Sequence, residues 1–369
     1  MTPLSGLKVV EMARILAGPW VGQALADLGA EVIKVEAPEG DDTRRWGPPF
    51  IERDGDTTAA YFYGANRGKT SVAIDFSTPE GQQQVHDLIA DADVFIENFK
   101  VGGLAKYGLD YDSLHALNPR LVYCSITGFG QTGPMAQEPG YDLMIQGMSG
   151  LMSITGNADG QPQKVGVAVT DVVTGLYSTI GIMAAIEQRH TTGKGQHIDM
   201  ALLDCASAML ANQNMNYLAT GTSPHRQGNA HPNLMPYQVM PTSDGHIIIA
   251  VGNDGQYRRF CDVLGASDLG TDPDYETNAK RIENRDVLTG LLEPLTTEFT
   301  SEKLLADLKA VKVPCGPINT IGQAFEGDQL RARGMQINPE GVAGVRGPWV
   351  FSDADLALDK SAPILPKSE

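Results

Sequence analysis

The first 36 residues alternate between strand and helix patterns, and this alternation strongly constrains the fold. Residues 7–11 and 31–36 are short runs rich in valine and isoleucine, which is typical of buried strands. Between them, residues 18–29 have the spacing of an amphipathic helix that ends at a glycine. A strand, a helix and a second strand in this order form a βαβ unit, whose two strands pair in parallel. We therefore expect the chain to begin with a parallel sheet.

The alternation continues through the first 220 residues. Further strands are expected at 93–97, 121–125, 165–169 and 196–200, and further helices from 78, at 112–117, at 172–188 and up to 218. This pattern predicts an α/β protein with a large doubly wound, Rossmann-like domain. The first strand-to-helix turn, residues 14–19, lacks the Gly-x-Gly-x-x-Gly that lets a dinucleotide pyrophosphate approach the backbone. A nicotinamide-dependent oxidoreductase is therefore disfavoured.

The composition changes after residue 220. Residues 221–241 are rich in Gly, Pro, Asn and His, which indicates a linker or an active-site loop. A strand at 245–251 and several helices follow, so we expect a smaller α+β domain. The predicted organisation is a large domain at 1–220, a small domain with its linker at 221–329, and a C-terminal segment at 330–369 that returns to the large domain.

The charge and cysteine content exclude several classes of protein. A net charge of -17 argues against binding to nucleic acid or to an acidic membrane, since both require a basic field. The four cysteines are widely spaced, which predicts neither a disulfide framework nor a metal site. The sequence shows no signal-peptide pattern and no apolar run that we expect to be long enough to span a bilayer. We therefore predict a cytoplasmic protein without membrane contact.

Basic residues concentrate in the first third of the chain. They are Arg14, Lys34, Arg44, Arg45, Arg67, Lys69, Lys100 and Lys106. This distribution suits a small anionic ligand, although scattered basic residues also form ordinary solvated surfaces.

Asp171 is the leading candidate for a nucleophile. It lies where the expected strand 165–169 gives way to the expected helix, and the positive end of a helix dipole favours an ionised carboxylate. The alternative is that Asp171 only caps the helix. The chain has neither a Gly-x-Ser-x-Gly elbow nor a His-Glu-x-x-His helix, which leaves a carboxylate nucleophile as the best option.

A polar loop at residues 252–255 can supply amide donors to a developing oxyanion. It reads Gly252, Asn253, Asp254, Gly255, and glycines allow close approach of backbone amides to a ligand. The alternative is an ordinary strand-to-helix turn in which Asp254 is the cap.

Ten segments, in order along the chain, resemble the class III coenzyme A transferases. They are residues 4–10, 17–19, 28–36, 40–44, 66–69, 96–99, 126–130, 140–142, 192–196 and 314–317. This family includes formyl-CoA transferase, carnitine CoA-transferase and, as a racemase branch, α-methylacyl-CoA racemase. The resemblance implies an intertwined homodimer, Asp171 as the catalytic aspartate, coenzyme A and acyl-CoA as substrates, and no permanently bound cofactor.

The resemblance also assigns the binding residues. Coenzyme A is expected beside Arg14, Ile15, Leu16, Ala37, Lys69, Asn98, Phe99 and Lys106. The acyl pocket is expected at Trp46, Tyr61 and Tyr141, and the 252–255 loop is expected to cover the aspartyl intermediate.

Two positions refine the expected activity. Leu16 stands where formyl-CoA transferase has a glutamine, and leucine cannot hydrogen-bond oxalate, so a larger acid is expected. Tyr141 stands where the racemase branch has a histidine, and tyrosine, with a pKa near ~10, is a poor base at neutral pH. Transfer is therefore favoured over racemisation.

The stretch at 226–233 resembles the branch that uses succinyl-CoA and dicarboxylic acids. The distal carboxylate of such an acid requires a cation, for which the candidates are Arg44, Arg45, Arg226 and His231. The expected function is transfer of coenzyme A from succinyl-CoA to a dicarboxylate through an aspartyl anhydride and an aspartyl-CoA thioester. An acyl-CoA racemase and a non-catalytic acyl-CoA binding protein remain the alternatives.

Overall fold

The computed structural model describes residues 1–366 and divides the chain into two compact units. The large unit comprises residues 1–152, 164–222 and the chain from 328 onward, and the small unit comprises 153–163 and 223–327. Residues 153–163 thus belong with the small unit, whereas the sequence pattern had placed them inside the large domain.

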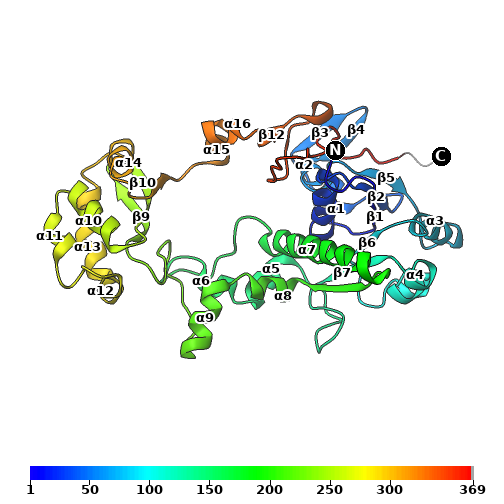
Figure 1. Cartoon of the computed structure of the whole chain (residues 1–369), viewed down its shortest axis with the longest axis horizontal. Helices are drawn as coiled ribbons and strands as arrows, with labels where there is room; N and C mark the ends of the chain where they lie inside the picture. Colours follow the sequence, from blue (N-terminus) through cyan, green and yellow to red (C-terminus); the bar gives the residue numbers. More distant parts are fainter. Residues whose placement is uncertain (367–369) are drawn as a thin grey trace. The chain divides into compact units, whose positions relative to one another are not determined.

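The large unit is built on a six-stranded parallel sheet (Figure 1). Its strands are β1 (Lys8–Glu11), β2 (Glu31–Glu36), β5 (Thr70–Ala73), β6 (Val94–Glu97), β7 (Val122–Thr127) and β8 (His197–Ala201). They lie in the order β5-β2-β1-β6-β7-β8, so the chain runs outward from β1 in one direction and from β6 in the other. The predicted α/β fold with a central parallel sheet is confirmed, and β1 and β6 form the topological switch point.

Helices of the large unit connect and flank these strands. They are α1 (Ala17–Asp27), α2 (Ala60–Tyr63), α3 (Pro79–Ile89), α4 (Tyr111–Leu117), α5 (Asp142–Met148), α7 (Val169–Thr192), α8 (Leu202–Ala208), α9 (Ala211–Thr220) and α16 (Asp328–Ala332), with 3₁₀ turns η1 (Asp42–Arg45), η2 (Ala105–Tyr107) and η3 (Pro339–Gly341). Two short hairpins complete the unit, β3 (Phe50–Arg53) with β4 (Asp56–Ala59) and β12 (Gln336–Ile337) with β13 (Gly344–Val345). The short helix α6 (Leu151–Ile154) lies where the chain passes between the units.

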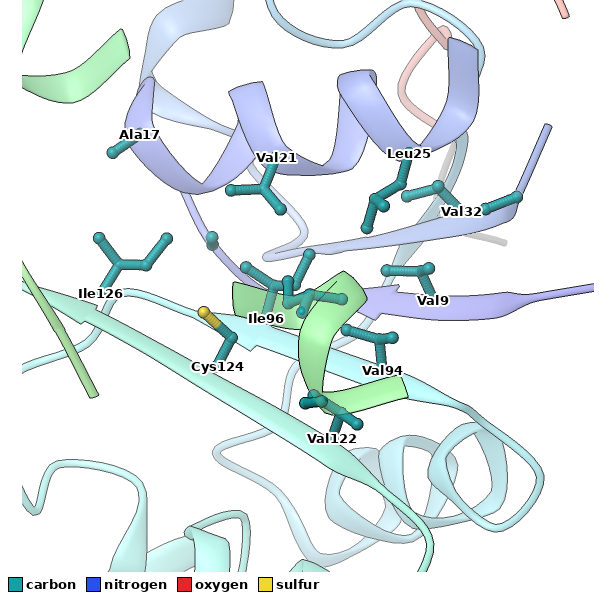
Figure 2. Close-up of a cluster of buried hydrophobic side chains, with 14 of the residues drawn as sticks. Val9, Ala17, Val21, Leu25, Val32, Val94, Ile96, Val122, Cys124 and Ile126 are labelled. Carbon is teal, nitrogen blue, oxygen red and sulfur yellow. The ribbon is translucent and has the colours of Figure 1, made fainter. Parts of the chain in front are cut away.

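Successive strand residues point to opposite faces of the sheet and into two separate cores. On one face, Val21 and Leu25 of α1 pack over Val9, Val94 and Ile96 (Figure 2). The opposite face is covered by a second cluster that α3 and α4 share with the strands; it includes Val10, Val85, Ile89, Phe95 and Leu114. Because apolar residues line both faces, the strands are continuous hydrophobic runs rather than alternating ones.

Helix α7 differs from its prediction in two ways. It begins at Val169, and residues 165–168 form no strand. Its 24 residues are long and apolar enough, by length and composition alone, to cross a membrane, so the expectation that no segment reaches this length was wrong. The helix packs against α1 so closely that a Cβ on Gly175 would lie 3.0 Å from the Ala17 carbonyl oxygen. A core helix passes the same length test, and 44% of its most apolar stretch is buried within one chain.

The small unit combines a three-stranded antiparallel sheet with helices. Its strands, in the order β11-β10-β9, are β9 (Tyr237–Thr242), β10 (Gly245–Ala250) and β11 (Cys315–Pro317). Its helices are α10 (Asp254–Val263), α11 (Ser267–Thr271), α12 (Asn278–Glu283), α13 (Arg285–Thr296), α14 (Ser301–Ala310) and α15 (Ile321–Glu326). Met240, Ile247 and Phe260 belong to its own buried core, as a separate folding unit requires.

Candidate active site

A cavity of about 420 Å³ opens at the carboxyl ends of the parallel strands, where the strand order reverses. Its walls are the turn after β1 (residues 14–17), the loop after β6 (98–101), the end of β7 (126–128) and the segment 136–142. Asp171 and Leu202 complete the lining. Ligands of open α/β sheets bind at such switch points, so we call this the switch-point cavity and take it as the candidate active site.

Asp171 lies in the first turn of α7 and lines the switch-point cavity. The N-cap of this helix is Ala168, so the alternative that Asp171 is the N-cap residue was wrong. Within residues 1–366, no hydrogen bond or ion pair engages the Asp171 carboxylate. A half-buried carboxylate without a partner is available to react with a bound molecule.

The surroundings of Asp171 favour its protonated form. Burial is the main cause that raises the pKa of this carboxyl to about 7, and the negative charge of Asp142 adds to the effect. The expectation that the helix N-terminus keeps Asp171 ionised was therefore wrong in direction. Near neutral pH the group lies close to its midpoint, where the ionised, nucleophilic form is still well populated.

Asp142 supplies the cap that α7 does not receive from Ala168. Its Oδ1 accepts hydrogen bonds from the backbone nitrogen of Thr170 at 2.9 Å and from Thr170 Oγ1 at 2.7 Å. Its Oδ2 accepts a 2.7 Å bond from Gln146 Nε2, and Gln146 Oε1 in turn accepts from the Val165 nitrogen at 2.8 Å. These contacts fix the first turn of α7 and thereby the position of Asp171.

From the sequence, Asp142 is expected only as a cap within its own Gly-Tyr-Asp-Leu turn, and not as the cap of α7. Asp142 and Thr170 lie 28 positions apart in the sequence, so no local capping pattern links them. The loop next to Asp142 was also missed: Gly128 and Gly140 pass so close that a Cβ on Gly128 would lie 2.5 Å from the Gly140 Cα. The glycines were visible in the sequence, but their contact required the fold.

Five of the residues expected to bind coenzyme A line the switch-point cavity. The side-chain amide of Asn98 holds the main chain of Arg14, accepting from its nitrogen at 2.9 Å and donating to its oxygen at 2.7 Å. The Arg14 guanidinium lies 5.5 Å from the centre of the Phe99 ring. Ile15 and Leu16 continue the same wall. An exposed guanidinium beside an aromatic ring suits an anionic ligand that carries a planar group.

Lys69 is not brought to the cavity. The residue is 3% exposed, and its ammonium group pairs with Glu11 Oε2 at 2.8 Å and donates to the Pro19 carbonyl and to Asn66 Oδ1. Burial, the largest cause, lowers the pKa of Lys69 to about 8. All three ammonium hydrogens are used within the protein, so this geometry gives no support to a contact between Lys69 and a phosphate.

Ala37 and Lys106 are exposed outside the lining of the switch-point cavity. The Lys106 ammonium lies 4.5 Å from the centre of the Tyr107 ring. The role of both residues in coenzyme A binding therefore stays a prediction.

The aromatic residues expected at the acyl pocket occupy two places. Tyr141 lines the cavity next to Asp142 and is 65% exposed. Trp46 and Tyr61 pack edge to face with ring centres 5.3 Å apart. Burial raises the pKa of Tyr61, and the charges of Asp171 and Asp142 raise it further. Tyr61 therefore lies within electrostatic range of the candidate nucleophile.

The cations proposed for a distal carboxylate differ in availability. Arg44 is buried and bonded to Glu36 through Nε at 2.8 Å and Nη2 at 2.6 Å, so it was a wrong candidate. Arg45 is more exposed and pairs with Asp42 at 3.0 Å. A surface ion pair of this kind exchanges readily with solvent and with ligands.

The remaining predicted residues belong to the small unit. Arg226 donates to the main-chain oxygens of Asn157 at 3.2 Å and of Gly160 at 2.9 Å. The rings of His231 and Tyr237 have their centres 5.1 Å apart and are tilted by 55°. Burial, followed by the charge of Arg285, lowers the pKa of His231.

The 252–255 loop forms the start of α10. The Gly252 nitrogen donates to Gln256 Oε1 at 2.7 Å, and Asn253 caps the helix by accepting from the Gln256 nitrogen at 3.0 Å. Asp254 pairs instead with Arg281 at 2.7 Å, so the alternative of Asp254 as the cap was wrong. Gly255 lies within the first turn.

Among residues 1–366, no three or more His, Cys, Asp or Glu side chains lie together in a group that could hold a metal ion.

Comparison with known proteins agrees with this geometry. The sequence model of "CoA-transferase family III" matches residues 4–367. A succinate–glutarate CoA-transferase of Agrobacterium fabrum is 54% identical, over 98% of this chain and 93% of the relative. The mouse succinyl-CoA:glutarate CoA-transferase is 42% identical, over 99% and 84%.

Solved structures show the same fold over the whole length. The crystal structure of a CAIB/BAIF family protein from Brucella suis superposes with a TM-score of 0.91 at 60% identity, and the match covers 99% of this chain and 97% of that one. A family match over nearly every residue, together with an unpaired carboxylate in the switch-point cavity, shows that the chain belongs to CoA-transferase family III.

Proposed function

We propose that this enzyme transfers coenzyme A from succinyl-CoA to a dicarboxylic acid, with glutarate as the first acceptor to test. The bacterial and mouse relatives carry these two acids in their names. The human succinyl-CoA:glutarate CoA-transferase, 40% identical over 98% of this chain, adds to this support. The single observation that carries the mechanism is the unpaired carboxylate of Asp171 in the switch-point cavity.

In the first half of the proposed reaction, the Asp171 carboxylate attacks the thioester carbonyl of the donor. The C–S bond breaks, coenzyme A leaves as its thiolate, and a mixed anhydride joins the acyl group to Asp171. The bound thiolate then attacks the aspartyl carbonyl of this anhydride. The bond between the aspartyl carbonyl carbon and the bridging oxygen breaks, the donor acid leaves as a carboxylate that keeps this oxygen, and an aspartyl-CoA thioester remains.

The second half repeats these steps in reverse order. The acceptor carboxylate attacks the aspartyl thioester and releases the thiolate, which gives a second anhydride. The thiolate then attacks the acceptor's carbonyl, and the bond that breaks returns Asp171 as a free carboxylate. No proton is gained or lost over the cycle, which is consistent with a cavity where, among residues 1–366, no histidine contributes to the lining.

We propose Tyr141, Trp46 and Tyr61 as the walls of the acyl pocket and Arg45 as the leading cation for a distal carboxylate. Tyr141 lines the cavity and Tyr61 lies in electrostatic range of Asp171. The Arg45 side chain is 56% exposed, and its nearest acid is Asp42 at 3.0 Å. An incoming carboxylate can compete for such a guanidinium.

We also propose that the enzyme acts as a homodimer. Helices α5, α7 and α9 expose large apolar side chains to solvent in a single chain: Leu143, Met144, Met148, Leu176, Tyr177, Ile180, Met215, Tyr217 and Leu218. Scattered exposed apolar residues are ordinary, but a concentration on three helices is typical of a surface covered by a partner. A second copy would bury the exposed half of α7.

The central test is the conversion of glutarate to glutaryl-CoA in the presence of succinyl-CoA, measured by chromatography. Asp171→Ala is expected to lose about 10³-fold or more in kcat, because the covalent route has no other nucleophile. Asp204→Ala is the matched control, since Asp204 is an exposed acid in the first turn of the neighbouring helix α8.

Hydroxylamine added during turnover should leave a hydroxamate on Asp171, identified by peptide mass. Full activity in Asp171→Ala, or modification at another carboxylate, would rule out this nucleophile.

A further inference from the structure

The turn between β1 and α1 holds a strained residue. Ile15 has a φ of +71°, and among the non-glycine residues with positive φ in the described chain it is the one with a β-branched side chain. Branching at Cβ makes the left-handed region especially unfavourable. Such strain persists only where the surrounding structure enforces it, and it concentrates at functional sites.

Three side chains enforce this conformation by binding consecutive main-chain groups. Lys34 Nζ donates to the Ala13 carbonyl oxygen at 2.8 Å. The side-chain amide of Asn98 holds both the nitrogen and the oxygen of Arg14. Asp41 Oδ2 accepts from the Ile15 nitrogen at 3.2 Å.

Asp41 is itself held rigidly. It is 2% exposed, and Lys34 Nζ lies 3.1 Å from its Oδ2. Its Oδ1 accepts from the Thr43 nitrogen at 3.0 Å and from Thr43 Oγ1 at 2.8 Å. Its own nitrogen donates to Glu36 Oε2 at 2.8 Å. A buried carboxylate with this many donors costs little to keep charged and resists displacement.

We propose that Asp41 is a positioning residue for the coenzyme A substrate: it holds Ile15 in the left-handed conformation and so shapes the wall of the switch-point cavity formed by residues 14–17. Asp41 lies outside the lining of this cavity and acts on it through the Ile15 nitrogen. The inference rests on the proposed function, because it assumes that this wall receives an acyl-CoA.

The test is a double-mutant cycle between Asp41 and Ile15. Asp41→Asn is expected to raise KM for succinyl-CoA about tenfold and to change kcat less than about twofold, because the geometry at Asp171 is kept. In an Ile15→Gly background the same substitution is expected to change KM less than about twofold, because glycine adopts this φ without Asp41. Asp75→Asn removes the same charge at an exposed turn and should leave KM unchanged.

A merely structural role of Asp41 predicts a different result. Both kcat and the folded fraction would then fall, and glycine at position 15 would not restore KM. An equal KM increase in both backgrounds would therefore overturn the proposal.

Two further measurements decide the matter if Asp41→Asn does not fold. Thr43→Val removes the hydroxyl that orients Asp41 and should raise KM about threefold, again only when residue 15 is isoleucine. Ile15→Gly should unfold at a higher temperature than Ile15→Ala, since glycine alone tolerates this φ. The opposite order of unfolding temperatures would contradict the claim that the backbone at position 15 is strained.

The proposal and the proposed function fail in different ways. If the wild-type protein binds no succinyl-CoA in a calorimetric titration, the proposed function fails and the role of Asp41 in coenzyme A binding fails with it. If the wild type binds and the cycle shows no coupling, only the role of Asp41 fails.

Discussion

At the scale of single residues, the surroundings of Asp171 determine the pH at which its carboxyl group ionises. Burial and the nearby charge of Asp142 raise its pKa to about 7. In the proposed mechanism the ionised form is the nucleophile, so the reactive fraction of Asp171 should increase as pH rises through this value. Asp142 also fixes Thr170, so one carboxylate influences both the charge and the position of Asp171.

We expect kcat/KM to rise with pH along a limb centred near pH 7, as Asp171 ionises in the free enzyme. Asp142→Asn should move this limb to lower pH by about half a unit to one unit, because the substitution removes the charge and keeps an oxygen that can accept from Thr170. A pH–rate profile of both proteins measures the shift. An unchanged limb in the variant would show that Asp142 does not set this pKa.

The same pKa predicts how stability depends on pH. The pKa of folded Asp171 is raised above the ordinary value of 3.8, so its protonated form contributes stability at low pH that is lost as pH rises through about 7. Asp171→Asn mimics the protonated carboxyl group and cannot ionise, so the variant does not lose this stability as pH rises. We expect its advantage in melting temperature over the wild type to be larger at pH 8 than at pH 5, as measured by scanning calorimetry. A constant difference would argue against a raised pKa.

At the scale of elements, the candidate site depends on where the main chain approaches itself. The segment after β7 and the segment before α5 cross at Gly128 and Gly140, and both line the switch-point cavity. No side chain fits between them, because a Cβ on Gly140 would lie 2.3 Å from the Gly128 Cα. The crossing holds Tyr141 and Asp142 against the cavity.

Gly128→Ala is expected to destabilise the protein by about 1–3 kcal/mol, because the added methyl group forces two backbones apart. Gly147→Ala is the control, since a Cβ there meets only Met152 Sδ at 3.7 Å and alanine favours the interior of α5. Chemical denaturation of both variants measures the difference. Equal stability would show that the crossing can relax.

At the scale of the whole molecule, helices α5, α7 and α9 expose large apolar side chains in a single chain. Helix α7 buries one side against α1 and the sheet, while Ile180 on it is 64% exposed. Helices α5, α7 and α9 all belong to the large unit, and the small unit has a separate core. Covering it would remove a substantial apolar area from water.

We expect the protein to sediment at twice its chain mass of 39.5 kDa. Ile180→Asp should shift this equilibrium toward the monomer, because a charge in a buried apolar interface is costly. Thr191→Asp, an exposed position near the end of α7, introduces the same charge as a control. A wild-type monomer, or a dimer that Ile180→Asp leaves intact, would contradict this interface.

The parallel sheet and Asp171 were both predictable, because hydrophobic periodicity and the position of Asp171 at the start of a helix are local properties. The contacts that make the site were not. Lys69 and Arg44 resemble ligand-binding cations in the sequence, yet both form ion pairs with buried carboxylates. The sequence shows which residues are charged but not which residues they pair with. Only the fold decides which charged side chains remain available to a ligand.

The sequence by itself determined the fold class, five of the six strands of the parallel sheet and the candidate nucleophile. Only the tertiary structure decided that Asp142 caps α7, that Asp41 restrains Ile15, and that the pKa of Asp171 is raised. The physical reason is range: helix and strand patterns arise from residues a few positions apart. Burial and electrostatics depend on groups that only the complete fold brings together.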